Sequence, residues 1–217
     1  LARDFSIKGH YDIAAELYQE LGATKDDLRS GKYVRYAAAF FYNSMKGENQ
    51  SRERILIDAL SILVDDIGLR IAFGSQLISM EYYDDAYQIF EEVNQTLDAD
   101  RHTTLVMMSI AWRGGSQLPE RKASILKDLE SYHIEGWYRK VIMFVLGEID
   151  EKTIYSLVDN ANKACEIHYL IGLIKSMEGQ KNDSIKHLLI SLETKASRNL
   201  EYRYAHDKLK KIIAGSH

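Results

Sequence analysis

Few side chains in this 217-residue chain are spaced for chemistry, and the clearest pair is Cys165 with His168. Residues three apart lie near one face of a helix, so the pair could supply two ligands of a zinc site. With Lys163 or His168 beside it, the same thiol could instead act as a nucleophile. No further ligands and no complete catalytic set follow nearby. The sequence therefore favours a buried thiol beside a packing imidazole.

Other patterns that could support catalysis are incomplete. The aspartate pairs at 65–66 and 84–85 could carry acid–base chemistry, but at helix starts they are favoured as caps and as partners of the helix dipole. Segment 73–76 lacks the second glycine of a nucleophile elbow and falls inside a predicted helix. The seven histidines form no His-Glu-x-x-His pair, and no glycine-rich phosphate loop occurs. We expect no enzyme activity, no metal and no cofactor.

Composition points to a globular helical chain. Hydrophobic residues make up 46% and charged residues 28%, with one proline in the whole chain. A single cysteine excludes an intrachain disulfide. The chain has 28 basic and 32 acidic residues, so its net charge gives no indication of nucleic acid as a partner. No apolar run approaches the roughly 18 residues of a membrane helix, so no direct membrane insertion is expected within this chain.

Charge is unevenly distributed along the chain. Residues 1–100 carry 10 basic and 18 acidic side chains, whereas residues 101–217 carry 18 basic and 14 acidic ones. In an elongated protein this division would produce an acidic end and a basic end, which could steer a charged partner. The alternative is a chance distribution over solvated helix faces.

Apolar periodicity predicts helices throughout and therefore an all-α fold. Apolar residues recur at helical spacing in several stripes, for example Ile55, Ala59, Ile62 and Leu63, and later Val141, Phe144 and Val145. Pro119 suits the first turn of a helix, where a missing N–H costs nothing. Strict alternation over six residues and Asn-Gly hairpin turns are both absent, so strand signals are scarce.

A repeat underlies these helices. Three residues recur with an offset of 98: Gly74 with Gly172, Ala86 with Ser184, and Phe90 with Leu188. That offset is close to three periods of about 33 residues. Glycines also end helices at a similar interval, at Gly9, Gly47, Gly115, Gly147 and Gly179, with Glu81 midway between the second and third. Left-handed backbone at these positions would reverse the chain and produce antiparallel helix pairs.

The pattern resembles the tetratricopeptide repeat, in which small residues let two paired helices pack closely. Its implied fold is a right-handed superhelix of about five to six helix pairs, forming one domain over residues 1–217. A half-repeat with Gly9, Tyr11, Ala14 and Tyr18 lacks its first helix, which suggests a truncated N-terminus. Residues 198–213 would form the capping helix. The sequence departs from the family pattern at Leu188, which replaces the aromatic residue, and in lacking the terminal proline of each repeat.

A second resemblance covers roughly the C-terminal third. Segments 136–149, 168–172 and 201–205 are similar to bacterial envelope lipoproteins of the NlpI type. Those are helical-repeat adaptors that dimerise and bring proteases and peptidoglycan hydrolases together. The resemblance implies a bacterial cell envelope or periplasmic location and a possible homodimer, with the cytoplasm as the alternative location.

The repeat resemblance would place the first helix of each pair on a concave surface. We expect the partner-binding residues there to be His102, Trp112, Arg113, Trp137, Glu166 and Tyr169. Alternatively, Trp112 belongs to the core at a repeat junction. The sequence thus predicts a non-enzymatic scaffold or adaptor that binds a protein or peptide segment in its groove. Alternatives are a secretion-type chaperone for an unfolded client and a regulatory repeat domain of a larger protein.

Overall fold

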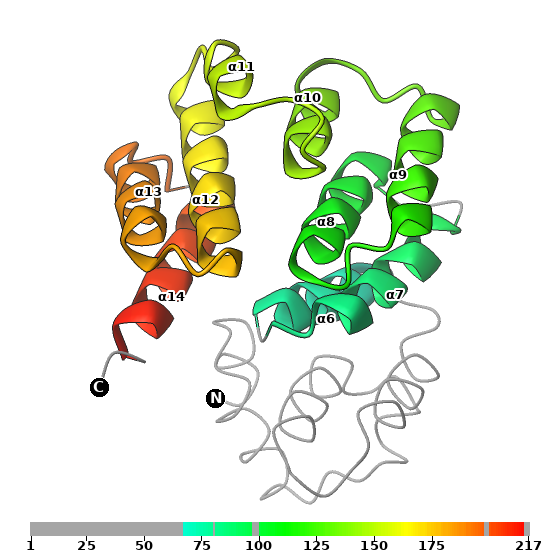
Figure 1. The fold of residues 1–217 in the computed structure, drawn as a ribbon, viewed down its shortest axis with the longest axis horizontal. Coiled ribbons are helices and arrows are strands. Elements are labelled where there is room, and N and C mark those ends of the chain that lie inside the picture. Colours follow the sequence, from blue (N-terminus) through cyan, green and yellow to red (C-terminus); the bar gives the residue numbers. More distant parts are fainter. Residues whose placement is uncertain (1–66, 80, 97–99, 198–199, 215–217) are drawn as a thin grey trace, which may run out of the picture. The chain divides into compact units, whose positions relative to one another are not determined.

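The computed structural model describes residues 67–79, 81–96, 100–197 and 200–214 (Figure 1). All regular secondary structure in these residues is α-helical, which confirms the all-α prediction. The chain divides into two compact units, Leu1–Asp100 and Arg101–His217. The predictions at positions 9–18, at Gly47, at 55–63 and at 65–66 lie outside the described residues.

The described helices follow one another with short connections. In the first unit they are α6 (Ile67–Ser79) and α7 (Tyr83–Asn94). In the second they are α8 (Arg101–Gly114), α9 (Pro119–Ser131), α10 (Gly136–Val145), α11 (Glu151–Tyr155), α12 (Ala161–Met177), α13 (Lys181–Glu193) and α14 (Leu200–Ala214). Pro119 occupies the first turn of α9, as its sequence position predicts.

Helices α6 and α7 form a close pair because a glycine faces an aromatic ring. Gly74 is buried, and a Cβ atom added to it would lie 2.7 Å from Cζ of Phe90. Ala86 and Phe90 on α7 are themselves fully buried. Segment 73–76 therefore lies inside α6, where Gly74 serves helix packing.

The same arrangement recurs in α12 and α13. A Cβ atom added to Gly172 would lie 2.9 Å from Cγ of Leu188 and 3.2 Å from the carbonyl oxygen of Ser184. The Ser184 hydroxyl donates a hydrogen bond of 2.7 Å to the carbonyl oxygen of Gly172. The offset of 98 residues thus relates two helix pairs that use equivalent positions for their closest approach.

Equivalent turns end four of the described helices. Glu81, His133, Gly147 and Gly179 take φ values of 66°, 51°, 76° and 73°, in the left-handed region. At each, the residue's N–H and the following N–H bond to carbonyls three and five residues earlier, as in a Schellman motif. Gly147 and Gly179 agree with the sequence prediction. Gly115 does not, since its φ is not positive, and the left-handed residue after α8 is Gln117.

The second unit is built around three helices that contact one another, α8, α10 and α12. Helix α9 packs on α8, α11 packs on α10, and α13 packs on α12. The predicted stripe on α10 forms core, because Val141, Phe144 and Val145 are all buried. Helix α12 also contacts α14, which contacts α13 as well, so these three helices pack against one another.

Helix α14 matches the predicted capping segment to within two residues at its start. It contacts both α12 and α13. Ala205 is fully buried, whereas Tyr202 and Leu209 are half-buried and Lys210 is exposed. The helix therefore covers the α12–α13 pair with one face and presents the other to solvent.

None of the helices in the described residues is both long enough and apolar enough to cross a bilayer.

Candidate functional site

An exposed group of aromatic and basic side chains lies where α8, α9 and α10 come together. The His102 ring on α8 is exposed, and its centroid lies 5.2 Å from that of Tyr138 on α10, which is 44% exposed. Beside them, the Arg101 guanidinium lies 4.5 Å from the ring centroid of Tyr132, at the end of α9. We call Arg101, His102, Tyr132 and Tyr138 the aromatic cluster.

A polar contact next to this cluster links α10 to α12. The indole Nε1 of Trp137 donates a hydrogen bond of 2.6 Å to Oε2 of Glu166. The ammonium group of Lys163 lies 5.0 Å from the centroid of the same indole ring. Trp137, Lys163 and Glu166 are all half-buried, so their polar atoms contact each other at the edge of the core.

Burial dominates the electrostatics of Glu166. Burial, together with the nearby Glu201, raises the pKa of this carboxyl to about 7. The hydrogen bond from Trp137 and the charge of Lys163 act in the opposite direction. Glu166 therefore changes its protonation state close to neutral pH.

All six predicted binding residues lie on α8, α10 and α12, with Trp112 and Arg113 both on α8. His102 is on α8 and Trp137 is on α10, while Glu166 and Tyr169 lie three residues apart on α12. The Tyr169 ring also contacts that of Tyr204 on α14, with centroids 6.0 Å apart. These four residues thus lie on three helices that contact one another, α8, α10 and α12.

Trp112 is placed differently from the prediction of a groove residue. Its side chain is only 6% exposed, and its Nε1 donates a hydrogen bond of 3.0 Å to the carbonyl oxygen of Leu118. The ammonium group of Lys122 on α9 lies 5.4 Å from the indole centroid. Because α9 folds back over it, the large indole is buried in the α8–α9 junction. The core alternative for Trp112 therefore holds.

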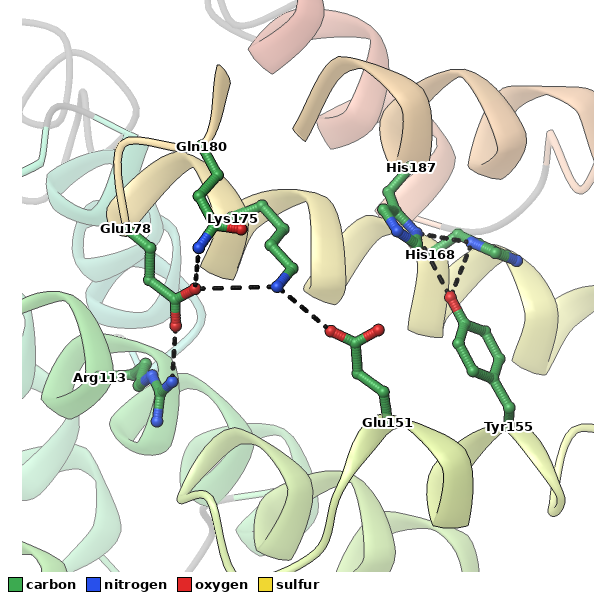
Figure 2. A network of polar contacts seen from close by, with 8 residues as sticks. All are labelled: Arg113, Glu151, Tyr155, His168, Lys175, Glu178, Gln180 and His187. Carbon is green, nitrogen blue, oxygen red and sulfur yellow. Dashed lines mark hydrogen bonds and ion pairs between the residues drawn. The ribbon is translucent and has the colours of Figure 1, made fainter. Parts of the chain in front are cut away.

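Arg113 belongs to a polar network that joins α8, α11 and the end of α12 (Figure 2). Its Nη2 bonds to Oε1 of Glu178 at 2.8 Å. Glu178 also accepts a hydrogen bond from Gln180. The ammonium nitrogen of Lys175 lies 3.9 Å from Oε2 of Glu178 and 3.4 Å from Oε1 of Glu151. Such partly exposed ion pairs stabilise by about 0–1 kcal/mol each. Arg113 therefore already has an intramolecular partner.

Cys165 and His168 both face α13, but each has its own partners there. Cys165 is buried, with Sγ 3.3 Å from Oγ of Ser191, and that hydroxyl donates a hydrogen bond of 2.9 Å to the Cys165 carbonyl. His168 lies near His187 instead. The expectation of a buried thiol is confirmed.

His168 is part of a triad that the sequence analysis missed, formed with His187 and Tyr155 (Figure 2). The two Nδ1 atoms lie 3.1 Å apart, and the Tyr155 hydroxyl lies 3.4 Å and 3.3 Å from those of His168 and His187. All three side chains are half-buried, and burial lowers the pKa of both imidazoles. The three residues are separated by 13 to 32 positions, so no local spacing in the sequence indicates that they meet.

Among the described residues, no group of three or more His, Cys, Asp and Glu side chains is arranged to hold a metal ion. The triad differs from such a group because its third member is a phenol.

Comparisons of this chain with protein-family models, curated proteins and solved structures give no match.

Proposed function

We propose that this chain is a non-enzymatic scaffold, built as a solenoid of tetratricopeptide-like helix pairs, that binds a protein or peptide segment. The binding surface would be the face made by α8, α10 and α12. The observation that carries the proposal is the aromatic cluster, in which Tyr132 and Tyr138 remain 37% and 44% exposed while contacting Arg101 and His102.

Aromatic and arginine side chains suit such a surface because they bury large areas with few rotatable bonds. Tyrosine also keeps a hydroxyl at its tip, so it can hydrogen-bond to a partner backbone while its ring covers apolar groups. Trp137 and Glu166 extend the surface from α10 onto α12. A partner segment that crosses these helices would meet rings, a basic group and a carboxyl that titrates near neutrality.

The solenoid part of the proposal is supported by the two equivalent helix pairs. Gly74 meets Phe90 in one pair and Gly172 meets Leu188 in the other, at equivalent positions. A single helix pair cannot bury its apolar face, whereas stacked pairs bury a continuous core. In such a stack the first helices line one common surface, and His102, Trp137 and Glu166 lie on those helices.

The test compares capture of partners by the wild type and by a double variant, His102→Ala with Tyr138→Ala. Both side chains are exposed, so we expect unchanged helix content by circular dichroism. The matched control is Leu189→Ala, because Leu189 is 45% exposed on α13 and outside the proposed surface. A partner captured from source-cell lysate is then purified and its affinity measured by calorimetry.

We expect the double variant to weaken the partner's affinity by about tenfold or more and the control to leave it unchanged. Equal binding by wild type and double variant would contradict the proposed surface. Binding only to unfolded clients, together with suppressed aggregation, would indicate a chaperone in place of a scaffold.

A further inference from the structure

We propose that Tyr155, His168 and His187 form a binding site for one divalent transition-metal ion, Zn²⁺ foremost, with the fourth ligand position open to water. The proposal concerns a different part of the second unit from the aromatic cluster and does not depend on the proposed scaffold function. It is based on the spacing of three donor atoms and on their placement on three helices.

The spacing of the donor atoms fits tetrahedral coordination. The Nδ1 atoms of His168 and His187 lie 3.1 Å apart, and the Tyr155 oxygen lies 3.4 Å and 3.3 Å from them. Zinc binds nitrogen and oxygen ligands at about 2.0–2.1 Å, which places two ligands of a tetrahedron roughly 3.3–3.4 Å apart. The three atoms are therefore already spaced as one face of a zinc tetrahedron, and the helices need not move.

The orientation of the two imidazole rings also suits coordination of one ion. The imidazoles of His168 and His187 are stacked at 27°, with centroids 5.3 Å apart, and both direct Nδ1 toward the Tyr155 hydroxyl (Figure 2). Each ligand comes from its own helix, Tyr155 from α11, His168 from α12 and His187 from α13. All three are half-buried, so a small ion can enter from solvent while the helices hold the ligands in place.

The choice of ion follows from the ligands. Imidazole suits Zn²⁺, Cu²⁺ and Ni²⁺, whereas Mg²⁺ and Ca²⁺ prefer sets of oxygen ligands. Four charged side chains act on His187: the carboxylates of Glu151 and Asp183 favour a cation, and the ammonium groups of Lys175 and Lys186 oppose it. These charges offset one another, and the protein supplies only three ligands. We therefore expect weaker binding than at a structural zinc site, which has four protein ligands.

Bound metal would connect three helices. Helix α11 spans only Glu151–Tyr155 and packs mainly on α10, while side-chain contacts join it to α12 and α13. An ion held by Tyr155, His168 and His187 would attach α11 to the α12–α13 pair. Metal binding should therefore raise the thermal stability of the chain.

The experiment titrates Zn²⁺ alone into the full chain, freed of any affinity tag, by isothermal titration calorimetry. We expect one ion per chain, with affinity reduced about tenfold or more in His168→Gln and in His187→Gln. His206→Gln is the matched control, since His206 is exposed on α14 and outside the triad. Circular dichroism checks that each variant remains helical.

A second measurement does not depend on the histidine variants being folded. Burial raises the pKa of the Tyr155 hydroxyl to about 12, so Cu²⁺ must displace its proton to solvent when it binds there. The resulting Cu²⁺–phenolate bond produces a visible charge-transfer band, which we expect in the wild type and not in Tyr155→Phe. The thermal midpoint of the wild type should also rise with Zn²⁺, and that of Tyr155→Phe should rise less. Absence of Zn²⁺ binding to the wild type, or Zn²⁺ binding of wild-type strength in His168→Gln and His187→Gln, would overturn the proposal and leave a hydrogen-bonded triad only.

Discussion

Phe90 lies so close over Gly74 that a methyl group on Gly74 would come within 2.7 Å of the ring atom Cζ. The contact allows α6 and α7 to approach at that point, and it recurs between Gly172 and Leu188. Because protein interiors are close-packed, such a position tolerates little added volume.

We therefore expect Gly74→Ala to lower the free energy of unfolding by about 1–3 kcal/mol. In an unhindered helix the same change would raise the free energy of unfolding by up to about 1 kcal/mol. The sign of the change in stability therefore distinguishes close packing from helix propensity. Urea denaturation followed by circular dichroism measures the effect. In a Phe90→Ala background, which removes the three close ring atoms, Gly74→Ala should cost less. An equal cost in both backgrounds would mean that Phe90 is not the cause.

Trp112 supplies a second prediction, because the structure places it in the core. Trp112→Ala should destabilise the second unit by about 3–5 kcal/mol through the cavity that it leaves. Trp112→Phe keeps an aromatic ring but loses the hydrogen bond to the Leu118 carbonyl, and should cost about 1–2 kcal/mol. Denaturant titration of both variants beside Tyr138→Ala, an exposed control, checks this order. A stable Trp112→Ala protein would return Trp112 to the candidate surface.

Glu166 predicts a pH dependence of stability. In the folded chain burial raises the pKa of this carboxyl from 4.5 to about 7, so the folded state holds the proton over a pH range in which the unfolded state has lost it. The stabilising contribution is complete below about pH 4.5 and is lost as pH rises through about 7. At most roughly 3 kcal/mol is involved, and less after solvent screening.

The measurement is chemical denaturation of the wild type and of Glu166→Gln at several pH values between 4.5 and 8. Glutamine keeps an acceptor for Trp137 but cannot titrate, so wild-type stability should fall relative to the variant as pH rises. Glu193→Gln, which removes an exposed carboxylate on α13, is the control and should show no such trend. A constant difference between wild type and Glu166→Gln would show that Glu166 does not titrate in this range.

Cys165 should be chemically inert in the folded chain. Its thiol is buried against Ser191, so a disulfide reagent can react only when the α12–α13 pair opens. We expect slow labelling in native buffer and rapid labelling in denaturant, measured by the release of the reagent's chromophore. A Glu193→Cys variant, which adds an exposed thiol, should release one equivalent at once. Rapid labelling of native wild type would revive the nucleophile hypothesis.

Local properties of the sequence predicted much of the fold. Apolar residues at helical spacing predicted the all-α class, since a buried helix face repeats every three to four residues. The small residues at Gly74 and Gly172 predicted where paired helices approach, because only small side chains fit there. Even the turn at Glu81, which lacks a glycine, followed from the repeat interval, and its φ is 66°.

Contacts between distant segments could not be predicted in the same way. Trp112 and Arg113 are neighbours in sequence, yet the first is buried under α9 and the second forms an ion pair with Glu178. Successive helix residues point about 100° apart, so only the packing of neighbouring helices decides which of them is covered.

What the sequence by itself determined is therefore the helical class, the repeated close approaches and the turns that separate helices. Only the tertiary structure decided that Tyr155, His168 and His187 meet, that Glu166 is buried beside Trp137, and that Tyr138 stays exposed. The physical reason is range: helix periodicity and turn conformation depend on residues a few positions apart, whereas burial and polar contacts depend on which helices pack together.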